Sequence, residues 1–188
     1  MLHRLIPLVL LVTGCADPGP RVEDVGGCDG KVQIIAEEPG VHVPMGTLID
    51  WSTNPPATGE HYQVWAAWDR SYTDLDRGYW VHNLEHGGIV LLYNCPGGCQ
   101  ETVDKLIDSA RTMDLDSACV APVRNRAIVS SDPLLPADVQ VAAVAWDVIY
   151  TATCFDPFVK SFAKQHYARG PEDLCTDGIA SGGTFIDP

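Results

Sequence analysis

Four of the six histidines of this chain lie in a short stretch of sequence: His42, His61, His82 and His86. If the segment around Glu85 forms a helical turn, His82 and His86 stand at positions i and i+4 on one face. Neutral imidazole is the commonest protein ligand of transition metals. We therefore predict a metal site formed by His61, His82 and His86, which His42 or Glu85 completes or supports.

Copper is the first candidate ion, because nitrogen-rich sites bind it most strongly in the usual affinity order of divalent metals, and zinc is the second. Met45 or Met113 offers a soft ligand. No separate set of acid, base and nucleophile is evident, so metal binding or delivery is expected rather than catalysis. The alternative is that the histidines are structural and hydrogen-bond backbone groups or Glu85.

Residues 82–86 also spell H-x-x-E-H, the pattern of inverted zinc peptidases, whose glutamate activates a metal-bound water. That motif needs a longer helix than Gly87 and Gly88 allow here. An alternative function is therefore a metal-dependent hydrolase in which Glu85 is the general base.

Residues 51–80 are rich in aromatic side chains, among them Trp65, Trp68 and Trp80. Exposed on a surface, these rings would bind a glycan or a peptide. Buried, they would form the core of a region that has few aliphatic residues. A cell-envelope binding module that uses this aromatic surface is the third functional hypothesis.

The N-terminal stretch has the features of an export signal: a basic start, an apolar run over residues 5–12 and small residues before Cys15. The apolar run is far shorter than the ~20 residues of a membrane-spanning helix. The residues before Cys15 resemble the lipobox of bacterial lipoproteins. We therefore expect residues 1–14 to be removed, Cys15 to carry lipid, and residues 15–27 to form a flexible tether. The protein would then be anchored in the cell envelope, on the periplasmic side or in the outer membrane.

The chain is acidic, with 25 Asp and Glu against 12 Lys and Arg and a formal net charge of −13. This charge repels phosphate backbones and anionic lipid head groups. It argues against nucleic acid as a partner and leaves the lipid anchor as the contact with the membrane.

Six cysteines remain after the one expected to carry lipid: Cys28, Cys95, Cys99, Cys119, Cys154 and Cys175. An even number in an oxidising compartment predicts three disulfides, whose pairing the sequence does not give. A thiolate metal site at Cys95 and Cys99 is the alternative, although structural zinc sites usually use two such close pairs.

Residues 28–188 are expected to form a single globular domain. Apolar and β-branched runs predict strands over 31–36, 88–93, 126–130 and 139–151, and helical spacing predicts helices over 100–114 and 155–169. The fold class is α+β: a single compact domain with a mostly antiparallel sheet and two main helices, stabilised by disulfides.

The segments P-P-x-T-G-x-H (residues 55–61) and V-H-x-L-E-H-G (residues 81–87) resemble the signature of a bacterial family of extracytoplasmic domains of unknown function. The segment Gly170-Pro171-Glu172 resembles the closing turn of that family. The resemblance covers residues 40–175 and implies which motifs matter, but it implies no activity. Glu60 departs from the family, which usually has proline there.

Overall fold

The computed structural model describes residues 19–179 and 182–186. The predicted signal and lipidation site, residues 1–14 and Cys15, lie outside the described residues. The strands are β1 (Arg21–Asp24), β2 (Lys31–Ile34), β3 (His42–Val43), β4 (His61–Tyr62), β5 (Arg70–Tyr72), β6 (Ile89–Tyr93), β7 (Ala127–Ser131), β8 (Val141–Ala145), β9 (Val148–Ala152) and β10 (Thr184–Phe185).

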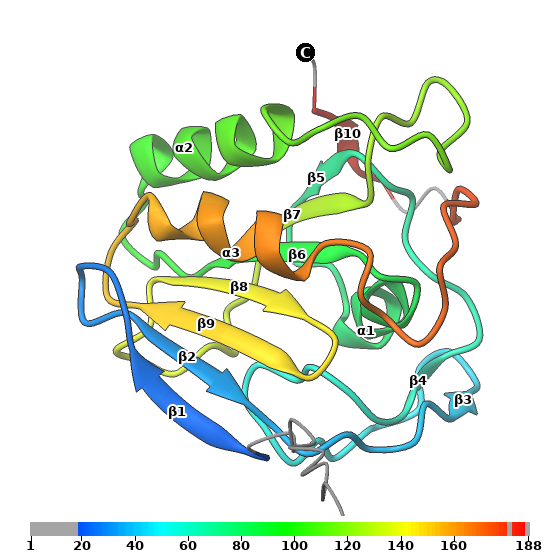
Figure 1. Ribbon diagram of the computed structural model, residues 1–188, viewed down its shortest axis with the longest axis horizontal. Helices are drawn as coiled ribbons and strands as arrows, with labels where there is room; N and C mark the ends of the chain where they lie inside the picture. Colours follow the sequence, from blue (N-terminus) through cyan, green and yellow to red (C-terminus); the bar gives the residue numbers. More distant parts are fainter. Residues whose placement is uncertain (1–18, 180–181, 187–188) are drawn as a thin grey trace, which may run out of the picture.

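Most of these strands form one eight-stranded sheet with the order β1-β2-β9-β8-β6-β7-β5-β10 (Figure 1). Neighbouring strands are antiparallel, except that β7 runs parallel to both β6 and β5. The remaining two strands, β3 and β4, form a separate parallel ribbon.

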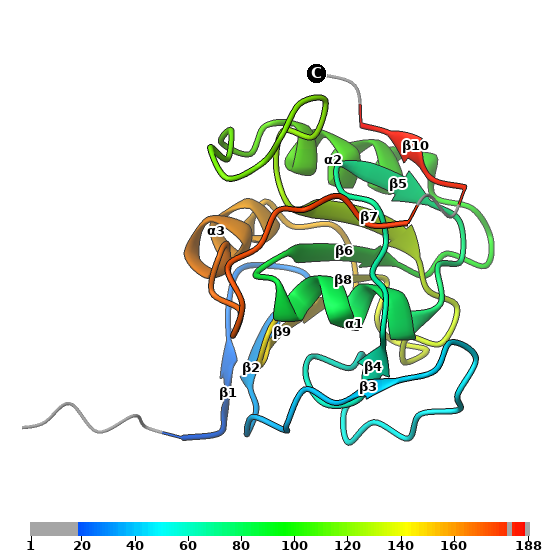
Figure 2. The same cartoon turned by 90° about the vertical axis from the view of Figure 1, so that its right-hand side faces the viewer.

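Within the described residues the helices are α1 (Arg77–Glu85), α2 (Gln100–Arg111) and α3 (Phe158–His166). The sheet separates α1 from α2 and α3, as Figure 2 shows. On one side Val90 and Leu92 of β6 pack in a cluster with Leu84 of α1. On the other side, the intervening residue Leu91 packs with Leu106 of α2 and with α3. The α+β class and the mostly antiparallel sheet are thus confirmed. No helix in the described part of the chain is long and apolar enough to cross a membrane.

Three local expectations are corrected. The apolar run 139–151 is two strands rather than one, because Ala145 pairs with Val148 and the chain turns between β8 and β9. Asp147 occupies this turn with φ 62°, a conformation that Asp tolerates better than most residues. Residues 21–24, expected within the flexible tether 15–27, form β1 and pair with β2.

The third correction is an additional helix, α1, beside the two that the sequence predicts. Helix α1 buries Trp80, Val81 and Leu84 against the sheet, and it buries His82 and Asn83 as well. Because it is buried on several sides, it has no apolar stripe at helical spacing, and only its last turn was expected.

The disulfides predicted from the cysteine count are confirmed, with the pairing Cys28–Cys154, Cys95–Cys99 and Cys119–Cys175. The first ties the segment between β1 and β2 to the end of β9. The third ties the loop after α2 to the C-terminal segment.

The disulfides should differ in their effect on stability, because a cross-link restricts the unfolded chain more when it closes a longer loop. Cys28 and Cys154 are separated by 126 residues in sequence, and Cys95 and Cys99 by 4. Replacing the first pair with serines should lower the free energy of unfolding by about 5 kcal/mol and the second pair by about 2 kcal/mol. Urea unfolding of the two double variants measures this, and equal losses would contradict it.

Candidate metal centre

Helix α1 carries two of the candidate ligands one turn apart, His82 and Glu85. Its first turn is capped by Asp76, whose carboxylate accepts a hydrogen bond from Gly78 N at 2.9 Å. It ends where Gly87 takes φ +79°, a conformation that favours glycine. His82 and Glu85 are buried, with exposed fractions of 2% and 7%. A polar helix end is therefore held inside the protein.

The parallel ribbon β3–β4 carries the other two ligands. His42 and His61 are register partners in the two strands, so their side chains leave the ribbon on the same face. Strand β4 packs against α1, which places this face over the helix. His61 is completely buried, whereas 49% of the His42 side chain is exposed.

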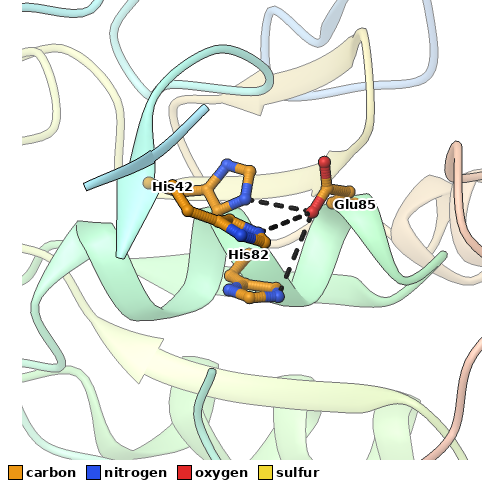
Figure 3. Close-up of side chains that lie close together, drawn as sticks. His42, His82 and Glu85 are labelled. Carbon is orange, nitrogen blue, oxygen red and sulfur yellow. Dashed lines mark hydrogen bonds and ion pairs between the residues drawn. The ribbon is translucent and has the colours of Figure 1, made fainter. Parts of the chain in front are cut away.

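Three imidazole rings converge on one carboxylate oxygen of Glu85 (Figure 3). Glu85 Oε2 lies 3.0 Å from His61 Nε2, 3.4 Å from His42 Nε2 and 4.0 Å from His82 Nε2. All four candidate ligand atoms lie within 4.8 Å of one another. A tetrahedral zinc ion with bonds of about 2.0–2.1 Å separates its ligand atoms by about 3.3–3.4 Å. The cluster is therefore close to the dimensions of such a site.

Backbone carbonyls determine which ring nitrogens face the cluster. His61 Nδ1 donates to Gly59 O at 2.9 Å, and His82 Nδ1 donates to Tyr62 O at 2.6 Å. Because a carbonyl only accepts, the proton of each neutral ring is on Nδ1, which leaves the lone pair on Nε2. His61 Nε2 faces Glu85 Oε2 at 3.0 Å, and His82 Nε2 faces His86 Nε2 at 3.2 Å. Metal-ligating histidines are oriented by this kind of hydrogen bond.

The loop before His61 explains the motif that precedes it. The Thr58 hydroxyl accepts from Glu38 N at 3.2 Å and donates to Glu38 O at 3.0 Å. Gly59 has φ +92°, and a Cβ there would lie 2.9 Å from Glu38 Oε2. Threonine and glycine at these positions therefore shape the turn that presents the Gly59 carbonyl to His61.

Burial favours the neutral form of two of the buried imidazoles, His82 and His86. Burial lowers the pKa of His82 to about 4. The pKa of His86 is also lowered to about 4, first by burial and then by the charge of the neighbouring His82. Burial alone would raise the pKa of Glu85. The hydrogen bond and charge of His61, with the charges of His82 and His42, outweigh that effect and lower the pKa of this carboxyl.

His86 is placed differently from the sequence prediction. It caps the end of α1 and lies outside the four-residue cluster, with its Nε2 3.2 Å from His82 Nε2 and 3.0 Å from Glu172 Oε2. The structure therefore groups His61 and His82 with His42 and Glu85. Glu172 was not among the predicted ligands, although it belongs to the closing turn that resembles the family.

Two further residues near the cluster had no recognisable signal in the sequence. Asn83 holds the chain at Ala66 with two hydrogen bonds, from Asn83 Nδ2 to Ala66 O at 2.9 Å and from Ala66 N to Asn83 Oδ1 at 3.0 Å. Gly40 lies against Glu85, and a Cβ at this position would collide with Glu85 Oε1. An asparagine and a glycine of this kind are recognisable only from their contacts.

The predicted aromatic surface is wrong for two of its three members. Trp68 and Trp80 have no exposed area and belong to the core beneath α1. Trp65 is half-buried, and its ring lies 4.9 Å from the ring of His82 and 4.5 Å from that of His86. It therefore forms a wall of the histidine cluster.

The soft ligands considered from the sequence are engaged elsewhere. The Met45 sulfur accepts a hydrogen bond from the Tyr79 hydroxyl at 3.4 Å. Met113 packs in the core on the opposite side of the sheet, and all six described cysteines are in disulfides.

Residues 42–177 match the model of a family described as "Protein of unknown function (DUF3105)". The matched segment begins at His42 and includes every residue of the cluster. No curated protein and no solved structure gives a significant match.

The metal-free protein should lose stability as the pH falls from about 6.5 to about 4, because His82 and His86 each have a pKa of about 4 in the folded state and about 6.5 in the unfolded chain. In this window the unfolded chain binds more protons, so acid favours unfolding, by about 2–3 kcal/mol for each histidine. Urea unfolding at neutral and mildly acidic pH measures the loss.

The variant His86→Asn provides the control and should lose less stability over the same window. Burial raises the pKa of Asp147 to about 6, which acts in the opposite direction but equally in both proteins. An identical pH dependence in the two proteins would show that His86 does not contribute.

Proposed function

The chain belongs to this family of proteins of unknown function, and we propose that it binds a divalent transition-metal ion, zinc or copper(II). The ligands would be His42, His61, His82 and Glu85. One observation carries the proposal: backbone carbonyls accept from Nδ1 of two buried histidines, so that both Nε2 atoms face the cluster. His61 Nε2 lies 3.0 Å from Glu85 Oε2, and His82 Nε2 lies 3.2 Å from His86 Nε2 and 4.0 Å from Glu85 Oε2. Groups that only accept hydrogen bonds need a proton or a cation between them.

The donor set supports zinc or copper(II) rather than copper(I). Three imidazole nitrogens and one carboxylate oxygen suit ions of intermediate softness. Copper(I) prefers thiolate and thioether sulfur, and the sulfur atoms considered as ligands are engaged elsewhere.

The geometry supports metal binding or delivery over hydrolysis. Glu85 Oε2 lies among three imidazole nitrogens, which is the place of a ligand rather than of a general base. His42 is the one half-exposed member of a cluster whose other members are buried. An ion held from three sides by buried groups would enter and leave on the side of His42.

The metal site is tested by comparing the unmodified protein with His61→Ala, Glu85→Gln and His42→Ala. The unmodified protein should bind at least one equivalent of zinc or copper(II). His61→Ala and Glu85→Gln should lose tight binding, and the loss of the more exposed His42 should weaken the affinity by about 10–100-fold. Mass spectrometry of the metal content and calorimetric titration measure these effects.

His166→Ala is the matched control, because His166 lies on α3 and packs against Phe162, outside the cluster. It should bind metal as the unmodified protein does. Failure of the unmodified protein to bind either ion would refute the proposal.

We also propose that the protein is a lipoprotein of the cell envelope, anchored through Cys15. The lipobox-like sequence supports this, and three disulfides suit an oxidising compartment outside the cytoplasm. Labelled palmitate should be incorporated into the protein and should fractionate with it into membranes. Cys15→Ser should abolish both, and equal labelling of this variant would refute the assignment.

A further inference from the structure

A second group of metal-ligand side chains lies beside the first and shares one member with it. The ligand atoms of Glu85, His86 and Glu172 lie within 4.8 Å of one another. His86 Nε2 is 3.0 Å from Glu172 Oε2 and 3.2 Å from His82 Nε2. Glu85 therefore stands between two sets of nitrogen and oxygen donors.

The hydrogen bonds available to His86 do not satisfy its ring in either neutral form. His86 is 2% exposed, and among the described residues its Nδ1 has no partner. With the proton on Nδ1, the Nε2 lone pair faces a carboxylate and the bare nitrogen of His82, and all three groups are acceptors. With the proton on Nε2, only one of those two acceptors receives it. A cation next to Nε2 would bind the acceptors of both His86 and Glu172.

The fold holds Glu172 at this position through its backbone. Glu172 N donates to Glu85 O at 2.9 Å. Gly170 packs so closely on the end of α1 that a Cβ there would collide with the backbone of Leu84, Glu85 and Gly87. The closing turn is therefore fitted to the C-terminal end of the helix.

A buried arginine fixes the same region from the other side. Arg126 Nη1 donates to His86 O at 2.8 Å and pairs with Asp173 Oδ1 at 2.7 Å. The disulfide Cys119–Cys175 anchors the segment that follows. The backbone of the turn is thus held on both sides of Glu172, while 53% of its side chain remains exposed.

We propose that His86, Glu172 and the shared carboxylate of Glu85 form a second divalent-cation site, which makes the centre dinuclear. The inference rests on the proposed metal binding at the first site. Glu85 would bridge the two ions, and the single lone pair of His82 Nε2 would serve the first of them. Bridged ions of this kind stand about 3.5–4 Å apart.

The second site has one nitrogen and two carboxylate donors, so it takes harder divalent ions than the first, with zinc and cobalt(II) in range. The exposed side of Glu172 leaves positions on the second ion for water or an anionic oxygen ligand.

Cobalt(II) titration of the full chain tests this, with bound metal measured after equilibrium dialysis and the spins followed by electron paramagnetic resonance. The unmodified protein should take up two equivalents, and the second should reduce the signal of the first through coupling across Glu85. Glu172→Gln should take up one equivalent with an undiminished signal. Because that side chain is half-exposed, the variant should keep the fold, which circular dichroism checks.

Glu60→Gln is the matched control, since Glu60 is an exposed carboxylate next to His61 outside both donor groups. It should still take up two equivalents. One equivalent in both the unmodified protein and Glu172→Gln would overturn the second site and leave the first standing. Two equivalents in both would also overturn it, because the second ion would then bind elsewhere. No uptake by the unmodified protein would refute both sites.

Discussion

The burial of a polar helix end is the constraint on which the rest of this structure depends. Of the five positions 82–86 at the end of α1, all except Leu84 are polar or charged, and all five are buried. Each polar group placed there needs a hydrogen-bond partner, because burying an unpaired amide or hydroxyl costs about 2–7 kcal/mol. Asn83 is satisfied by both backbone groups of Ala66, and His82 by the carbonyl of Tyr62. The segments wrapped around α1 thus supply hydrogen bonds to the helix as well as apolar contacts. The groups left facing one another at the centre are imidazole nitrogens and a carboxylate, the groups that a cation binds.

The site combines a rigid base with one accessible side. The sheet places β6 directly beneath α1, and the closing turn with Arg126 holds the helix end. By contrast, His42 comes from a ribbon of two short strands, and its side chain is half-exposed. Fixed ligands on three sides give affinity and geometry, because the ordering cost is met during folding rather than during binding. If an ion binds as proposed, the single exposed ligand would give it a route in and out.

Much of the fold could be predicted from local sequence. Strand β6 was recognisable as a continuous β-branched run, and α2 and α3 were recognisable because one face of each packs on the sheet and the other meets solvent. The division of residues 139–151 into β8 and β9 was missed. Both strands are buried on both faces, so no alternation of polar and apolar residues marks the turn. Helix α1 was missed beyond its last turn for the same physical reason, since burial on several sides removes the periodic signal.

The sequence by itself determined the types of ligand and most of the candidates, because histidine and glutamate are concentrated in motifs with recognisable spacing. It also favoured pairing of the cysteines over a thiolate metal site, since their number is even and the expected compartment is oxidising. Only the tertiary structure decided which ligands meet. The i and i+4 spacing brings His82 and His86 to the same face of the helix end, but it does not say which of them shares a cluster with His61. The register of β3 on β4 places His42 over α1 beside His61, and the closing turn takes His86 into contact with Glu172. Strand register and the packing of a distant turn depend on contacts far apart in sequence, so spacing along the chain does not encode them.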